Sequence, residues 1–78
     1  MKSVAVTLHG ELNLYRSDKS RFFRIELEEQ STAGQLLEAL GLPLGVLSML
    51  MINDKRADTD SPISDGDLLE AFPLCGGG

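Results

Sequence analysis

Apolar and polar residues alternate along two stretches in the first third of the chain. The two stretches, each with its apolar face, are residues 2–8 (Val4, Val6, Leu8) and residues 21–27 (Phe23, Ile25, Leu27). A period of two is typical of a strand with one buried face. We therefore predict two strands that pair antiparallel. The polar residues 9–20 between them predict a long loop whose few apolar side chains pack locally.

The pattern becomes helical after residue 31. Thr32 can cap the free backbone N–H groups of a first turn while Gln35 reaches back to it, which is the pattern of a capping box. The apolar positions that follow recur at the spacing of one helical face and are Ala33, Leu36, Leu37 and Leu40. Gly41 then supplies a left-handed position and Pro43 blocks continuation, so we expect the helix to end there.

The second half of the chain predicts shorter elements separated by turns. An apolar run over residues 47–52 suits a central strand, and Asn53-Asp54 forms the turn that follows it. Residues 55–57 predict a short return strand, and residues 68–72 predict the last strand. We expect Pro73 to end the pairing of this last strand, because proline has no backbone N–H to donate.

Two strands, one helix and then two or three further strands form an α+β order. The simplest packing lays one amphipathic main helix across one face of a mixed sheet of four to five strands, which buries both apolar surfaces. This is the element order of a ubiquitin-like β-grasp domain. We expect residues 1–73 to form that domain and residues 74–78 to form a flexible, extended, glycine-rich C-terminal tail.

Composition and charge narrow the classes of function. The chain has 78 residues, of which 42% are hydrophobic and 24% charged, as expected for one small globular core. The single cysteine excludes an internal disulfide, and no stretch reads as a signal peptide or a membrane span, so we expect a cytoplasmic protein without membrane contact. A net charge of −5 with scattered basic residues argues against nucleic-acid binding. The acidic excess either solubilises the surface or steers the chain towards a basic protein.

The sequence as given ends in three glycines. Without Cβ atoms, such a tail can lie extended in a tunnel too narrow for side chains, and its one reactive group is a terminal carboxylate. We therefore expect Gly76 and Gly77 to thread into the active site of a partner and Gly78 to carry the reacting carboxylate.

Apolar residues near this tail form a candidate docking surface for partner proteins. These residues are Phe72, Leu74 and Leu68, and exposed apolar patches usually mark protein contacts. Leu74 is hard to bury because it lies beyond the last strand and Pro73. For Phe72, the alternative interpretation is that the ring belongs to the core.

Several short motifs resemble those of one protein family. They are Ile52-Asn53-Asp54, Ser64-Asp65-Gly66-Asp67, Leu69, Phe72-Pro73 and the terminal Gly77-Gly78. In these motifs the chain resembles the sulfur-carrier family, whose members include the small subunit of molybdopterin synthase and the carrier protein of thiamine thiazole synthesis. Residues 9–20 lack the short helix common in the molybdopterin type, and Gly76 stands where that type usually has Ala or Ser. The receiving pathway, molybdopterin or thiamine, therefore stays open.

The resemblance implies a carrier protein and not an enzyme in its own right. In the family, an E1-like adenylating enzyme uses ATP and Mg²⁺ to convert the terminal carboxylate, here that of Gly78, to an acyl-adenylate. A persulfide sulfur then displaces AMP and leaves a thiocarboxylate, which donates its sulfur inside a synthase subunit. ATP and Mg²⁺ belong to the activating partner, so the resemblance implies no cofactor or metal bound by this chain.

Two other classes of function also fit the sequence. A ubiquitin-like modifier would join Gly78 to a lysine of another protein, and a plain binding module would carry the glycines incidentally. We expect no catalytic residues, because the sequence offers no nucleophile–base pair or ligand set. His9 is the only histidine, so neither a metal cluster nor a Cys/His pair can be assembled from the sequence. Cys75 is interpreted as a small apolar residue and not as a sulfur relay.

Overall fold

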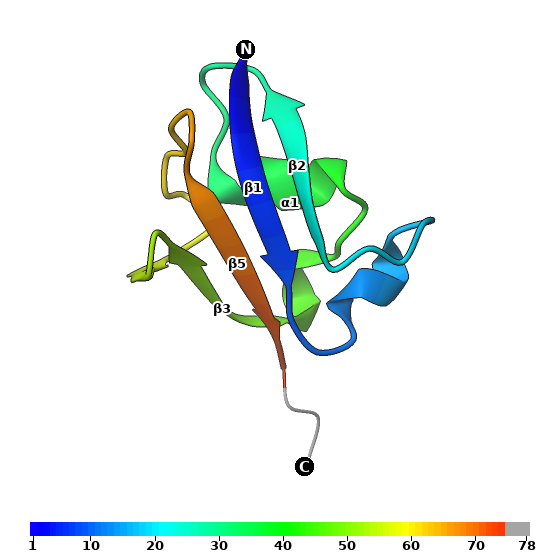
Figure 1. Cartoon of the computed structure of the whole chain (residues 1–78). Helices are drawn as coiled ribbons and strands as arrows, with labels where there is room; N and C mark the ends of the chain where they lie inside the picture. The colour runs from blue at the N-terminus through cyan, green and yellow to red at the C-terminus, as the bar shows by residue number, and fades with distance from the viewer. Residues whose placement is uncertain (75–78) are drawn as a thin grey trace.

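A computed structural model describes residues 1–74 of the chain, and its elements follow the predicted order (Figure 1). The strands are β1 (Lys2–Leu8), β2 (Phe22–Leu27), β3 (Leu47–Ile52), β4 (Lys55–Ala57) and β5 (Leu68–Pro73). The helices are the main helix α1 (Ala33–Ala39) and two short 3-10 helices, η1 (Leu12–Tyr15) and η2 (Leu44–Val46). The predicted α+β class, with one main helix on a mixed sheet, is confirmed.

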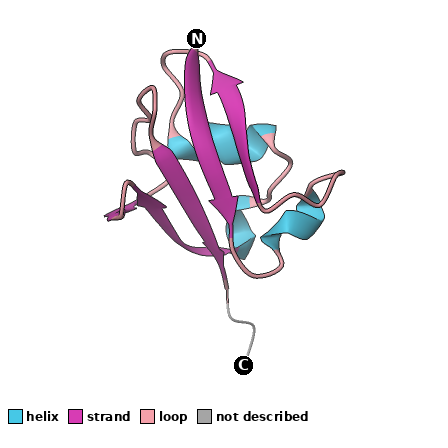
Figure 2. Cartoon of the chain, in the orientation of Figure 1, coloured by secondary structure: helices cyan, strands magenta, loops and turns pink. Residues whose placement is uncertain are grey.

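The five strands form one sheet in the order β2-β1-β5-β3-β4. β1 pairs antiparallel with β2, as predicted, and parallel with β5, so the first and last strands lie side by side (Figure 2). β3 pairs antiparallel with both β5 and β4. Because β1 and β5 run in the same direction, the residues that follow β1 lie next to the end of β5.

Helix α1 begins at the predicted capping box. The backbone N–H of Gln35 donates to Oγ1 of Thr32 at 3.2 Å, and the N–H of Thr32 donates to Oε1 of Gln35 at 2.9 Å. The helix is followed by Gly41, whose φ of 85° lies in the left-handed region that favours glycine. Both predicted boundary signals therefore act as expected.

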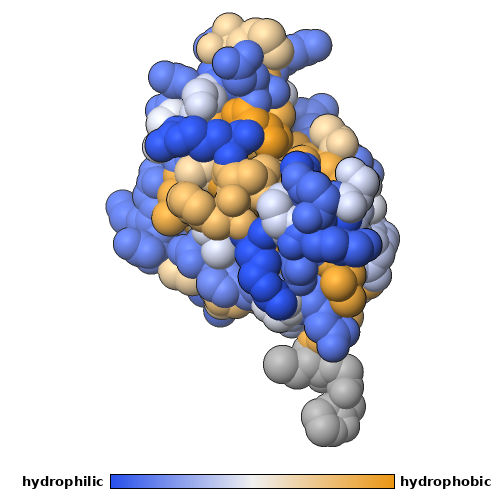
Figure 3. Space-filling view, turned by 45° about the vertical axis from the view of Figure 1, so that its right-hand side comes forward, coloured by the Kyte–Doolittle hydropathy of each residue, from blue (hydrophilic) through white to orange (hydrophobic). Residues whose placement is uncertain are grey.

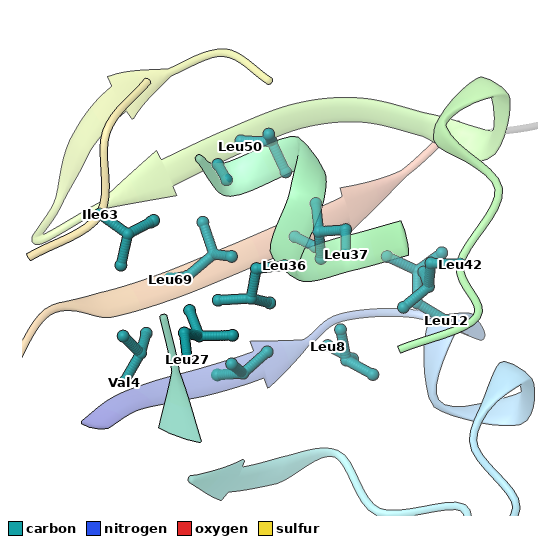
Figure 4. Close-up of a cluster of buried hydrophobic side chains, with 13 residues drawn as sticks. Val4, Leu8, Leu12, Leu27, Leu36, Leu37, Leu42, Leu50, Ile63 and Leu69 are labelled. Carbon is teal, nitrogen blue, oxygen red and sulfur yellow. The ribbon is translucent and has the colours of Figure 1, made fainter. Parts of the chain in front are cut away.

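The core lies between α1 and one face of the sheet. Leu36 and Leu37 point from the helix towards the strands, where they meet side chains such as Leu69 (Figure 4). Burying one such leucine contributes about 1.5–3 kcal/mol. The buried apolar residues are Val4, Val6, Leu8, Leu12, Leu27, Ala33, Leu36, Leu37, Leu42, Leu50, Ile63, Leu69 and Ala71. Within the described part of the chain, no helix is long and apolar enough to cross a membrane.

Two expectations about local structure are wrong. Residues 9–20 are not a plain loop, because η1 forms where the side chain of Leu12 turns into the core and is only 1% exposed. Pro73 does not end the pairing of the last strand. It lies within β5 opposite Leu47, and the next backbone N–H, that of Leu74, donates to the carbonyl of Val46 at 2.9 Å. The pairing continues because Leu74 supplies a donor one residue after the proline.

Candidate functional site

The structure separates the predicted docking residues into two places. Leu74 follows β5 and is 56% exposed, and Phe72 is half-buried two residues before it. Leu68 begins β5, so about 20 Å of strand, at about 3.3 Å per residue, separates it from Leu74. Leu68 therefore does not join the other two beside the tail. The remaining residues singled out from the sequence, Cys75, Gly76, Gly77 and Gly78, lie outside the described residues.

Phe72 is covered by a histidine from the other half of the chain. The His9 ring stacks on the Phe72 ring with centroids 4.2 Å apart and planes 5° from parallel. Nε2 of His9 lies 3.0 Å from Oε2 of Glu70, and the backbone N–H of His9 donates to the carbonyl of Ala71. Side chains alternate along β5, so Phe72 and Glu70 lie on the face opposite the buried Ala71. Phe72 is therefore not part of the core under α1.

The surface turned to the viewer in Figure 3 mixes apolar and hydrophilic residues. On the open sheet face, the outward-facing positions of the two central strands are mixed as well. They are Ser3, Ala5 and Thr7 of β1 and Leu68, Glu70 and Phe72 of β5. Leu68 belongs to this open sheet face and not to the end of the strand.

A glycine allows the chain to pass close to the end of β5. Gly10 has φ of 61°, and a Cβ atom at this position would lie 2.5 Å from Cγ of Pro73. Real Cβ atoms do not approach carbon this closely, so any larger residue would push the two segments apart. This close approach places η1, which begins two residues after Gly10, beside Pro73.

The approach of η1 to β5 creates an apolar groove of about 370 Å³. Its walls come from η1, from η2 and from the end of β5, and its one charged side chain is that of Glu11. The lining residues are Glu11, Leu12, Leu14, Tyr15, Gly45, Val46, Pro73 and Leu74. The sequence carried no signal for this groove, because its three walls are distant along the chain and only the fold brings them together.

One group of the residues that carry the family resemblance lies at the opposite end of β5. Asn53 Nδ2 donates to Oδ1 of Asp67 at 2.8 Å, and the backbone N–H of Leu68 donates to Oδ1 of Asn53 at 3.0 Å. The second carboxylate oxygen of Asp67 accepts from the N–H of Ser64 at 2.8 Å. These side chains satisfy backbone and amide donors where β5 begins. Their positions give them a structural role far from Leu74.

The groups described around the end of β5 are mainly apolar, with one histidine–carboxylate pair among them. Within residues 1–74, no three His, Asp or Glu side chains gather in a way that could hold a metal ion. His9 and Glu70 form a hydrogen-bonded pair, and the His9 ring also stacks on the Phe72 ring. The described part of the site therefore offers shape and apolar surface.

The fold is that of a ubiquitin-like β-grasp domain. In this fold the first and last strands pair in parallel at the centre of a mixed sheet, and one main helix lies across one face. The family model described as Mut7-C ubiquitin matches residues 1–76. The chain belongs to this Mut7-C ubiquitin family. None of the curated proteins compared with the chain matches it.

Solved structures of the same fold include carriers and modifiers. SAMP1 from Haloferax volcanii is 24% identical with a TM-score of 0.74, over 97% of this chain and 99% of that one. Urm1 from Trypanosoma brucei is 16% identical with a TM-score of 0.72, over 99% and 96% of the two chains. A chain from the complex of subunits 1 and 2 of the molybdopterin-converting factor of Helicobacter pylori is 28% identical with a TM-score of 0.63, over 97% and 99%. The chain thus shares the fold of small carrier and modifier proteins.

Proposed function

We propose that this chain is a sulfur carrier whose Gly78 carboxylate is adenylated and then converted to a thiocarboxylate by partner enzymes. The observation that supports this most is the direction of β5. It is the central strand of the sheet, and it ends beside Leu74, which is exposed and precedes the glycine-rich residues that include Gly78. Four extended residues reach about 13 Å at about 3.3 Å each, enough to bring a carboxylate into the active site of another protein.

The proposed chemistry uses groups that the partners supply. A carboxylate oxygen of Gly78 attacks the α-phosphorus of ATP, and pyrophosphate leaves with Mg²⁺ balancing its charge in the E1-like enzyme. The terminal sulfur of a persulfide donor then attacks the acyl carbon, and AMP leaves. A thiol cleaves the resulting acyl disulfide, which leaves the thiocarboxylate on Gly78 and a disulfide on the donor side. A synthase subunit takes the sulfur for molybdopterin or for thiamine.

In this proposal, residues 1–73 serve as the folded body and residues 74–78 as the tail, with Gly76 and Gly77 inside the partner. Leu74 and Phe72 then lie where the partner must contact the body. A Leu74→Glu variant should keep its fold, because Leu74 is exposed, and should bind the adenylating enzyme much less tightly. Binding equal to that of the unaltered protein would refute the docking role of Leu74.

The carrier function is tested by the intact mass of the protein purified from its own cell. We expect a species in which one C-terminal oxygen is replaced by sulfur. Deleting Gly78 should abolish ATP–pyrophosphate exchange by the E1-like enzyme while the circular dichroism and the unfolding midpoint stay unchanged. An unchanged rate of ATP–pyrophosphate exchange in the truncated protein would refute the proposal. The synthase that removes the sulfur in vitro then distinguishes the molybdopterin pathway from the thiamine pathway.

The likeness to SAMP1, a small archaeal modifier, favours a second candidate function. As a modifier, the chain would form an isopeptide bond between Gly78 and a lysine of another protein. Both functions begin with the same adenylation, so exchange assays do not separate them. Conjugates of high molecular mass in cell extract, absent when Gly78 is deleted, would favour the modifier over the carrier.

A further inference from the structure

Three large apolar side chains are exposed around the groove beside Leu74. Leu14 is 55% exposed, Tyr15 46% and Leu74 56%, and all three line the groove. Exposed apolar side chains that cluster around a hollow usually mark a site of protein contact. The open sheet face is a separate surface, because its exposed aromatic ring, that of Phe22, belongs to β2 and does not line the groove.

We propose that this groove receives an apolar side chain of the adenylating enzyme, and that a basic residue next to it pairs with Glu11. The inference rests on the proposed function. Leu74 forms a wall of the groove and is also the first residue of the tail. An enzyme that encloses the tail up to Leu74 must therefore cover the groove as well, so the groove belongs to the same interface.

The charge at the groove favours a basic partner. Glu11 is exposed and carries the one charge in the lining, and within residues 1–74 its carboxylate forms no ion pair. A lysine or arginine beside the inserted side chain would give this carboxylate a partner at the rim. A second copy of the chain is a poorer occupant, because each copy carries a net charge of −5 and would bring its own Glu11 to the contact.

Gly45 offers a direct way to fill the groove. It lines the groove, and a Cβ atom added to it would have no heavy atom within 4 Å. A Gly45→Leu variant should therefore fold normally and occupy the space that we assign to the partner's side chain. The matched control is Ser17→Leu, which adds the same exposed side chain outside the lining residues.

The experiment measures ATP–pyrophosphate exchange by the purified E1-like enzyme at varied concentrations of the carrier. Gly45→Leu should raise KM for the carrier at least tenfold with kcat unchanged, because the tail itself is intact. Ser17→Leu should leave both constants unchanged. Leu14→Ser removes an exposed wall residue and should raise KM severalfold, whereas Phe22→Ser, which removes a comparably exposed side chain elsewhere, should not.

The pairing of Glu11 has its own readout. Glu11→Gln should raise KM about threefold at low salt and weaken the dependence of KM on ionic strength, since one charge pair is lost. Equal salt dependence in the two proteins would overturn the assignment of a basic residue to the rim.

Failure of this inference differs from failure of the proposed function. If the unaltered protein supports no exchange, the proposed function itself is wrong. If it supports exchange and Gly45→Leu and Leu14→Ser keep the normal KM, the groove inference alone is wrong. Dimers of the unaltered protein that Gly45→Leu dissociates in sedimentation experiments would overturn it in favour of a second copy.

Discussion

The two ends of β5 are built in opposite ways. At its start, side-chain carboxylates and amides hold the backbone through a dense set of hydrogen bonds, centred on Asn53 and Asp67. At its finish, close packing adds to the hydrogen bonds of His9 and Leu74, because Gly10 lies against Pro73 and the His9 ring stacks on Phe72. The start fixes the strand in the sheet, and the finish leaves apolar surface exposed.

The two ends also differ in how easily they can be recognised in the sequence. The Asp-Gly-Asp turn is easy to recognise in the sequence because hydrogen bonds require particular side chains at particular places. An apolar contact surface requires only suitable volume and exposure, which many residues can provide. The resemblance to sulfur carriers therefore depends in part on Asn53 and the Asp-Gly-Asp turn, which lie away from the proposed contact with partners, whereas Phe72 and Pro73 lie beside it.

The largest expected effect on the free energy of unfolding comes from a glycine at the finish of β5, which we compare with a glycine at its start. Gly10 and Gly66 both have positive φ, 61° and 86°, but a Cβ atom would meet Pro73 at the first and nothing at the second. Gly66→Ala should cost about 1 kcal/mol of unfolding free energy for the left-handed conformation alone. Gly10→Ala should cost about 3 kcal/mol, because the overlap with the Pro73 ring adds to this cost. Urea unfolding measures both.

The same pair of variants also sharpens the assignment of the groove. Gly10→Ala should raise KM for the adenylating enzyme, since it moves η1 away from β5, while Gly66→Ala should leave KM unchanged. Equal losses of stability in the two variants would show that Gly10 and Pro73 are not in close contact, and the two ends would then be alike.

The second effect concerns the start of β5. Asp67→Ala leaves the amide of Asn53 and the N–H of Ser64 without their acceptor, and each lost hydrogen bond costs about 1 kcal/mol. We expect a loss of about 2 kcal/mol in urea unfolding and no change in KM at a temperature where the variant is folded. A rise in KM as large as that of Leu74→Glu would contradict a purely structural role for this end.

Local signals in the sequence predicted most of the elements. Thr32 and Gln35 form the predicted capping box, and Gly41 has the predicted left-handed backbone. These features depend on residues three or four apart, so the sequence holds all that is needed. The prediction for Pro73 was wrong because its place in the sheet depends on a distant part of the chain. Leu47 of β3 lies opposite it, and Val46, the last residue of η2, accepts from the next N–H.

The candidate site was harder to predict, because its parts come from distant segments. Leu74 could be identified as exposed from its place beyond the last strand. The contact of His9 with Phe72 requires the parallel pairing of β1 with β5, and the groove also requires η2 to reach the end of β5. Leu68 was grouped with Leu74 because sequence distance alone does not show that one strand carries them to opposite ends.

A smaller effect concerns the histidine that covers Phe72. His9→Ala removes both the stacked ring and the hydrogen bond to Glu70, and we expect a loss of about 1 kcal/mol. His9→Phe keeps a ring over Phe72 without that hydrogen bond and should lose about half as much. Urea unfolding, with the ring-current shift of the Phe72 protons as a second measure, tests both variants. No difference between them would show that stacking contributes nothing at this end.

The smallest expected effect lies in the loop after η1, where one carboxylate is held by hydrogen bonds. The backbone N–H and the hydroxyl of Ser20, with a further bond from Arg16, lower the pKa of the Asp18 carboxyl from 3.8 to about 2. Because the pKa is lower in the folded chain, this contribution to stability is fully present above pH 3.8 and is lost as the pH falls through about 2. Asp18 is exposed, so the contribution to global stability is small.

The prediction is measured by following the carboxyl carbon of Asp18 by NMR between pH 1 and 6. The midpoint should lie near 2, and Ser20→Ala should move it towards 3.8, since the hydroxyl donor is lost while the backbone donor remains. The loop is tied to η1, because the side-chain amide of Asn13 donates to the carbonyl of Lys19. The Asn13 amide signal should therefore follow the same midpoint. A midpoint near 3.8 in the unaltered protein would show that the hydrogen bonds from Ser20 and Arg16 do not hold the Asp18 carboxylate in the folded chain.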